Sequence, residues 1–173
     1  MPFSVLEECR RQADILSELY SSFHKVYATA ESLTAGLIGA TIVEVPGSSA
    51  WFDRGFITYS NEAKQQMLGV TAQTLKSYGA VSMQTVREMV SGALEHSLSD
   101  IAVAVTGIAG PDGGSAEKPV GTVWIGVQHR GNLPLVRCFH FEGDRQLVRD
   151  KTVLEALKAL ASVTRGEIPE QYS

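Results

Sequence analysis

The chain has 173 residues, of which 44% are apolar and 20% are charged, and its formal net charge is −4. A chain of this length and composition buries a core without disulfide or metal cross-links, which excludes the disordered and cysteine-stapled classes. The acidic balance argues against nucleic-acid binding by bulk electrostatics, and no apolar run approaches the roughly 20 residues that span a bilayer.

The N-terminus and the cysteines indicate a cellular compartment. Residues 1–8 lack the basic region and apolar stretch of a signal peptide. The two cysteines, Cys9 and Cys138, lie far apart in the sequence, so neither a disulfide framework nor a zinc site is expected. We therefore expect a cytoplasmic protein that contacts neither membrane nor nucleic acid.

The first half of the chain alternates between helical and strand patterns. Ser4 and Glu7 form a capping box before an amphipathic helix expected over about 4–22. Further elements are expected in this order: a strand at 26–30, a helix at 33–43, a strand at 51–59 and a short helix from Asn61.

The second half continues this alternation and adds a hairpin. Thr71 and Ser82 are expected to cap two helices. The apolar run 101–105 suits a strand covered on both faces. The remaining expected elements are a glycine-rich loop at 106–115, strands at 120–127 and 135–141 joined through 130–132, and a helix at about 145–163 capped by Asp144.

These elements predict an α/β fold, a three-layer α/β/α sandwich with a mixed sheet. We expect one domain over 1–173, with its core at about 5–163 and a frayed tail at 165–173. The last helix carries apolar residues on more than one face, and a homodimer is the expected assembly.

The first polar cluster, at 29–36, contains Ser32 at a predicted strand-to-helix turn. A serine hydroxyl there projects from the sheet edge, and the free amides of a new helix can hold a phosphate or an oxyanion. The alternative is that Ser32 or Glu31 only caps the helix.

The second cluster, at 47–64, places Tyr59 and Lys64 on either side of a strand-to-helix junction. A lysine that loses water can become neutral and act as a base. Lowering its pKa to about 7–8 costs about 4 kcal/mol, so a well-packed site is needed. The alternative is a solvated surface lysine.

The third cluster is the glycine-rich loop at 106–115, whose backbone amides can approach an anion closely. It lies at the carboxyl end of a predicted strand, where open α/β sheets bind ligands. It matches neither a Walker loop nor the dinucleotide fingerprint. The alternative is that the loop is a flexible connection without a binding role. The four histidines are scattered, which gives no support to a catalytic triad or a metal site.

Five segments together resemble one family. They are Ala30–Thr34, Gly47–Lys64, Gly79–Ser82, Thr106–Ser115 and Lys118–Trp124. In order and spacing they are similar to the CinA C-terminal domain family, in particular to its stand-alone bacterial members of the PncC type. The resemblance covers about residues 5–163.

The resemblance implies an amidohydrolase that converts nicotinamide mononucleotide to nicotinate mononucleotide and ammonia in pyridine nucleotide salvage, with no metal or cofactor. It implies Ser32 as the nucleophile, Lys64 as its base, Tyr59 in the same hydrogen-bonded group and Ser49 as a further catalytic candidate. The substrate-binding residues that it implies are Thr34, Thr106, Gly107, Gly110 and Arg145, the last as a bidentate phosphate partner. The sequence does not show whether Ser32 and Lys64 meet.

The chain departs from the family pattern at Ala35, where glycine is usual. If that glycine lets substrate approach the backbone, the extra methyl group weakens or blocks binding. Two other hypotheses therefore stay open: a diverged paralogue that binds a nucleotide without turnover, and a regulatory or interaction protein.

Overall fold

Five strands and six α-helices follow one another in residues 2–173, the part of the chain that the computed structural model describes. The strands are β1 (Tyr27–Glu31), β2 (Phe52–Ile57), β3 (Ile101–Gly107), β4 (Thr122–His129) and β5 (Leu135–His140). The helices are α1 (Val5–Phe23), α2 (Leu37–Val43), α3 (Asn61–Leu68), α4 (Ala72–Tyr78), α5 (Met83–Glu95) and α6 (Arg145–Thr164), with a 3-10 turn η1 (Ser48–Ala50) before β2.

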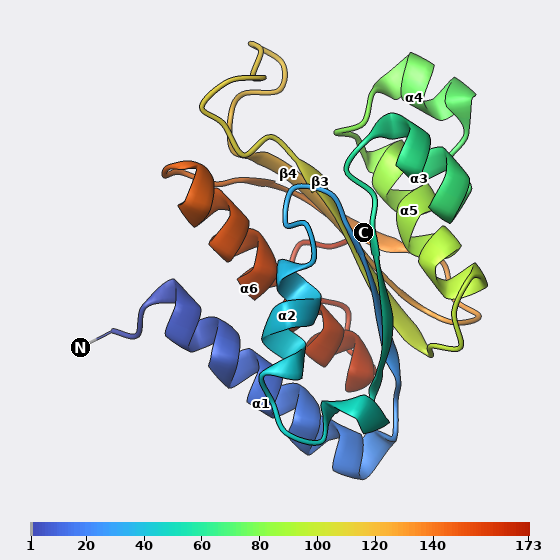
Figure 1. Ribbon diagram of the computed structural model, residues 1–173, viewed down its shortest axis with the longest axis vertical. Coiled ribbons are helices and arrows are strands. Elements are labelled where there is room, and N and C mark those ends of the chain that lie inside the picture. The colour runs from blue at the N-terminus through green and yellow to red at the C-terminus, as the bar shows by residue number, and fades with distance from the viewer. Residues whose placement is uncertain (1) are drawn as a thin grey trace.

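The strands form one mixed sheet in the order β2-β1-β3-β4-β5. β1 runs parallel to β2 and to β3, whereas β4 pairs antiparallel with both β3 and β5. Helices α1, α2 and α6 cover one face, and α3, α4 and α5 cover the other (Figure 1). The predicted three-layer α/β/α sandwich with a mixed sheet is confirmed.

Local sequence accounts for most element boundaries. Five helices begin where a capping side chain accepts a backbone N–H from three residues further on. These caps are Ser4, Ser60, Thr71, Ser82 and Asp144. β3 is buried along its length up to Thr106, as its near-continuous apolar run predicts. Among residues 2–173, no helix combines the length and hydropathy needed to cross a bilayer.

One predicted boundary is wrong, and the end of the predicted tail contacts the domain. Helix α2 begins at Leu37 and not at residue 33, because residues 32–36 form a turn in which Ala35 and Gly36 have positive φ angles of 47° and 93°. The segment 165–173, predicted to be a frayed tail, is largely exposed, but its end is anchored to the domain. Tyr172 lies edge-on to Phe139 and is only 9% exposed, and Ser173 exchanges two backbone hydrogen bonds with Val136.

The topology gathers three connections at one edge of the sheet. β1, β2 and β3 are parallel neighbours, so their carboxyl ends point the same way. The turn after β1, the segment from β2 into α3 and the loop after β3 therefore all leave this edge, where open α/β sheets bind ligands.

Candidate active site

Ser32 is the first residue after the central parallel strand β1. Its backbone N–H donates to the carbonyl of Val105 on β3 at 3.2 Å, which fixes the start of the turn to the neighbouring strand. Only 6% of Ser32 is exposed. The hydroxyl therefore has a defined position at the sheet edge and reaches little bulk water.

Lys64 reaches Ser32 from helix α3. Ser60 caps this helix, and its carbonyl accepts the backbone N–H of Lys64 at 3.1 Å. The Nζ of Lys64 lies 3.1 Å from the Oγ of Ser32. The same nitrogen donates to the carbonyls of Thr58 at 2.9 Å and Tyr59 at 3.2 Å. The structure thus brings Ser32 and Lys64 into direct hydrogen-bond contact.

The environment of Lys64 favours its neutral form. The residue is 1% exposed, and burial lowers the pKa of its amine to about 8. Its three hydrogen-bond partners are a hydroxyl and two peptide carbonyls, which carry no net charge to stabilise the ammonium. At neutral pH about a tenth of such amines are unprotonated, so an amine able to accept a proton lies beside the Ser32 hydroxyl.

A second polar group lies beside the pair. The hydroxyl of Thr58 is buried and has no protein partner within residues 2–173. Because the carbonyl of the same residue bonds Lys64, this hydroxyl offers an unused hydrogen-bonding position in the same segment.

The carboxylate of Glu31 organises the turn that follows it. Its Oε1 accepts the hydroxyl of Thr34 at 2.7 Å and the N–H of Ile38 at 2.9 Å. Its Oε2 accepts the hydroxyl of Thr29 at 3.0 Å and the N–H of Gly39 at 3.1 Å. Helix α2 has no side-chain cap at Gly36, so Glu31 takes the capping role from the strand.

Arg145 joins the glycine-rich loop to the segment after β2. Asp144 caps α6 and places Arg145 at its first position. The guanidinium donates to the carbonyl of Gly110 at 2.8 Å and to the hydroxyl of Tyr59 at 3.4 Å. The loop projects beyond the sheet edge at the top of Figure 1.

A family model described as the CinA C-terminal domain matches residues 10–164. The chain belongs to the CinA C-terminal domain family. The nicotinamide-nucleotide amidohydrolase PncC of Enterobacter agglomerans is 55% identical over 129 residues, which cover 75% of this chain and 79% of that one. The PncC of Escherichia coli strain K12 is 52% identical over 132 residues, 76% of this chain and 80% of the relative.

Solved structures of the family share the fold. A competence/damage-inducible protein from Agrobacterium tumefaciens is 45% identical, covers 92% of this chain and 95% of its own, and has a TM-score of 0.82. A CinA superfamily protein from Klebsiella pneumoniae 700603 is 34% identical, covers 91% of this chain and 98% of its own, and has a TM-score of 0.87.

Three of the residues expected to bind substrate use their polar groups inside the protein. Thr34 is fully buried, and its hydroxyl donates to Glu31, so the expectation that it faces substrate is corrected. The hydroxyl of Thr106 donates to the carbonyl of Ala80 at 2.8 Å, although its position beside Val105 places it next to the turn. Gly110 engages Arg145 through its carbonyl.

Two further residues expected in the site, Gly107 and Tyr59, also make contacts within the protein. Gly107 ends β3 beneath the loop, where a Cβ would collide with Val123 at 2.6 Å, so glycine serves close backbone packing there. The phenol of Tyr59 is 64% exposed and contacts Arg145, and only the carbonyl of this residue belongs to the Lys64 group.

Ser49 lies at the other end of the sheet, so the structure does not bring this catalytic candidate to the Ser32–Lys64 pair. It sits in η1, which precedes β2, whereas Ser32 follows β1. These strands are parallel, and six strand residues at about 3.3 Å each place the two serines about 20 Å apart.

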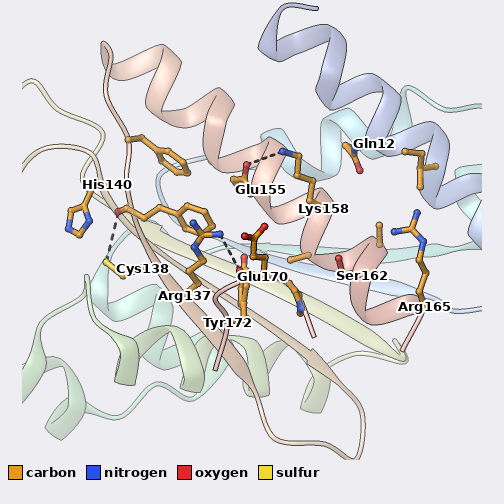
Figure 2. A pocket seen from close by; sticks show the side chains of 16 residues that line it. Gln12, Arg137, Cys138, His140, Glu155, Lys158, Ser162, Arg165, Glu170 and Tyr172 are labelled. Atoms are coloured by element: carbon orange, nitrogen blue, oxygen red, sulfur yellow. Dashed lines mark hydrogen bonds and ion pairs between the residues drawn. The ribbon is translucent and has the colours of Figure 1, made fainter. Parts of the chain in front are cut away.

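One cavity lies remote from this site. About 830 Å³ lies between β5, α6 and the C-terminal segment (Figure 2). Its charged groups are largely engaged with protein partners: Lys158 pairs with Glu155, and Arg137 donates to the carbonyl of Glu170. It contains neither member of the serine–lysine pair.

Two features that shape the site were not predicted from the sequence: the full set of Glu31 partners and the contacts of Arg149. The capping alternative considered for Glu31 was correct, but the number of its partners was not foreseen. Arg149 donates from α6 to the carbonyls of Leu33 at 2.9 Å and Thr34 at 3.3 Å, and its side chain thus ties the turn to a helix more than 100 residues away. Only the spacing Arg145-x-x-x-Arg149, one helical turn apart, indicated a shared face.

Proposed function

We propose that this chain is an amidohydrolase that converts nicotinamide mononucleotide to nicotinate mononucleotide and ammonia, in pyridine nucleotide salvage. The observation that carries the proposal is the 3.1 Å contact between the Nζ of Lys64 and the Oγ of Ser32 in a buried site. The PncC relatives, at 52–55% identity, support the substrate.

The carbonyls around Lys64 support its role as the base. A neutral amine has two N–H groups and one lone pair. If the two N–H groups donate to Thr58 and Tyr59, the lone pair remains for the hydroxyl proton of Ser32. The amine therefore needs no carboxylate or histidine to orient it.

The reaction proceeds in two halves. Ser32 Oγ attacks the carboxamide carbon as its proton moves to Lys64, and the intermediate collapses when Lys64 returns that proton to the departing nitrogen, which leaves as ammonia. Water then attacks the acyl ester and gives a proton to Lys64, which returns it to Ser32 Oγ as the acid leaves. Within residues 2–173 the N–H group of Leu33, next to Ser32, donates to no protein acceptor, and we assign it to the oxyanion.

The substrate phosphate fits the loop side of the site. The guanidinium of Arg145 lies in an exposed position between Gly110 and Tyr59, and an arginine binds phosphate through charge-assisted bidentate contacts. The nucleotide would thus lie with its amide at Ser32 and its phosphate toward α6.

The test is ammonia release from nicotinamide mononucleotide by the purified protein in the presence of a chelator. Ser32→Ala should abolish release, and Ser49→Ala, an exposed serine at the opposite end of the sheet, should leave it unchanged. Equal turnover by wild type and Ser32→Ala would overturn the mechanism. Folded wild-type protein without any release would overturn the function. The homodimer, the cytoplasmic location and the lack of a metal requirement stay predictions.

A further inference from the structure

The carboxylate of Glu31 occupies the centre of the turn that carries Ser32. It is 1% exposed, at the end of β1, which lies between the parallel strands β2 and β3. Four donors converge on it: two hydroxyls, from Thr29 and Thr34, and two helix N–H groups, from Ile38 and Gly39. Each carboxylate oxygen accepts one hydroxyl and one backbone N–H. Both oxygens therefore accept the same number of hydrogen bonds, and all four bonds are donated to Glu31.

These bonds connect three elements. The hydroxyl of Thr29 belongs to β1, that of Thr34 to the turn, and the two N–H groups to the first turn of α2. Ser32 and Leu33 therefore lie in a short connection between β1 and α2, and both of its ends are bound to the side chain of Glu31. From α6, Arg149 donates hydrogen bonds to the carbonyls of Leu33 and Thr34 in the same connection.

The neighbouring backbone is shaped to admit this carboxylate. A Cβ at Gly39 would lie 3.2 Å from the ring of Phe52 and 3.7 Å from the Oε2 of Glu31. A Cβ at Gly55 would lie 2.7 Å from the hydroxyl of Thr29. Glycine at both positions lets α2 and β2 approach the group closely.

Glu31 does not act on the base. Burial is the cause of the lowered pKa of Lys64, and no carboxylate contributes to it. All four hydrogen bonds of Glu31 lead to the scaffold and none to Ser32 Oγ or Lys64 Nζ.

We propose that Glu31 is a positioning residue, which holds the Ser32 hydroxyl in line with Lys64 by fixing the turn between β1 and α2 to its carboxylate. This proposal rests on the proposed function for the reaction that it serves. A displacement of about 1 Å at a nucleophile costs about 100-fold in rate, so a loosened turn lowers kcat while the distant phosphate contact is kept.

Glu31→Gln tests this directly. Glutamine keeps the shape but replaces one oxygen by an NH₂ group that faces two donors. We expect kcat to fall about 100-fold with KM within about twofold, and the pH midpoint of turnover to stay near its wild-type value because Lys64 is untouched. Thr34→Val removes a single donor and keeps the volume, and we expect kcat to fall about tenfold.

The matched control is Asp150→Asn, which changes a buried carboxylate of α6 that accepts one bond from Gln146. It should keep kcat within about twofold even if it lowers the melting temperature as much as Glu31→Gln does. A role of Glu31 in stability alone would make kcat per folded molecule equal in the two variants, and that result would overturn the proposal.

A second readout does not depend on the substrate. The rate at which a fluorophosphonate ester labels Ser32, followed by intact mass, should fall in Glu31→Gln in parallel with kcat. Labelling at the wild-type rate would overturn the positioning role. Wild-type protein that is labelled but releases no ammonia would instead overturn the proposed substrate and leave the effect of Glu31 on Ser32 measurable.

Discussion

Two connections leave neighbouring parallel strands at the same edge of the sheet, and they are built in opposite ways. The turn after β1 buries residues 31–34 and is held by the side chains of Glu31 and Arg149. The loop after β3 exposes residues 111–117, and its ties to the rest of the fold include those of Arg145 to Gly110 and of Lys118 to Tyr78. The buried turn carries Ser32, the proposed nucleophile, and the exposed loop carries the surface toward which the substrate phosphate would lie in the proposed function.

This contrast follows from the two proposed tasks, because proton transfer tolerates less displacement of its groups than substrate entry does. Proton transfer between Ser32 and Lys64 requires a fixed separation, which packing and buried hydrogen bonds supply. An entering nucleotide must cross an open surface, and exposed loops with few packing contacts adjust at low cost. Four predictions test whether the two connections really divide the work in this manner.

The largest effect is expected on the buried side. Lys64→Met keeps the volume of the side chain and removes the base, so turnover should fall about 1,000-fold, within the usual range for general-base removal. The same change removes the cost of burying the amine, about 3 kcal/mol for a pKa lowered from 10.5 to about 8, and should raise the melting temperature. Ammonia release and thermal unfolding measure the two outcomes. A variant that is both inactive and less stable would contradict this explanation.

The next effect is on the pH dependence of turnover. Only neutral Lys64 accepts a proton, so kcat should rise about tenfold per pH unit up to a midpoint near 8 and then level off. Stability should change in the same direction: between pH 8 and about 10.5 the unfolded chain binds more protons at this lysine than the folded chain does, so its contribution to the free energy of unfolding increases with pH. A flat kcat profile between pH 6 and 9 would exclude Lys64 as the base.

A smaller effect is expected on the loop side. Arg145→Ala removes the cation between Gly110 and Tyr59, and loss of a charge-assisted contact of about 1.5–3 kcal/mol should raise KM about 10- to 100-fold with little change in kcat. Steady-state kinetics at several ionic strengths measure this. If kcat falls as much as it does in Glu31→Gln, the exposed loop and the buried turn do not divide the work.

The smallest effect is expected at the one exposed alanine of the buried turn. Ala35 has a φ of 47°, which costs an L-residue about 1–2 kcal/mol, and its replacement by glycine relieves that strain but adds about 0.4–1 kcal/mol of unfolded-chain entropy. Ala35→Gly should therefore raise the melting temperature slightly and leave kcat within about twofold, since the methyl group faces solvent. A large gain in turnover would instead mean that Ala35 obstructs the substrate.

The sequence predicted the elements well because their causes are local. Capping side chains and apolar periodicity set the helices, and the run at 101–105 set the central strand. The serine–lysine contact depends on strand order, which places segments 32 residues apart at one edge, and no local pattern contains that information. The distance of Ser49 from Ser32 depends on the same information, since it follows from the parallel pairing of β1 and β2. The helix predicted from residue 33 begins instead at Leu37, because the positive φ angle of Ala35 has no signature in its side chain.

The backbone pairing between Ser173 and Val136 bears on how copies of this protein meet one another. An open sheet has two edges whose free N–H and C=O groups can recruit a strand from another molecule and start aggregation. Here the β5 edge is partly occupied by the last residue, and the β2 edge carries the charged pair Asp53 and Arg54. Both edges are thus poor templates for strand addition. Continuation of the sheet from one molecule to the next is therefore disfavoured, and any assembly of copies would join through helices or loops.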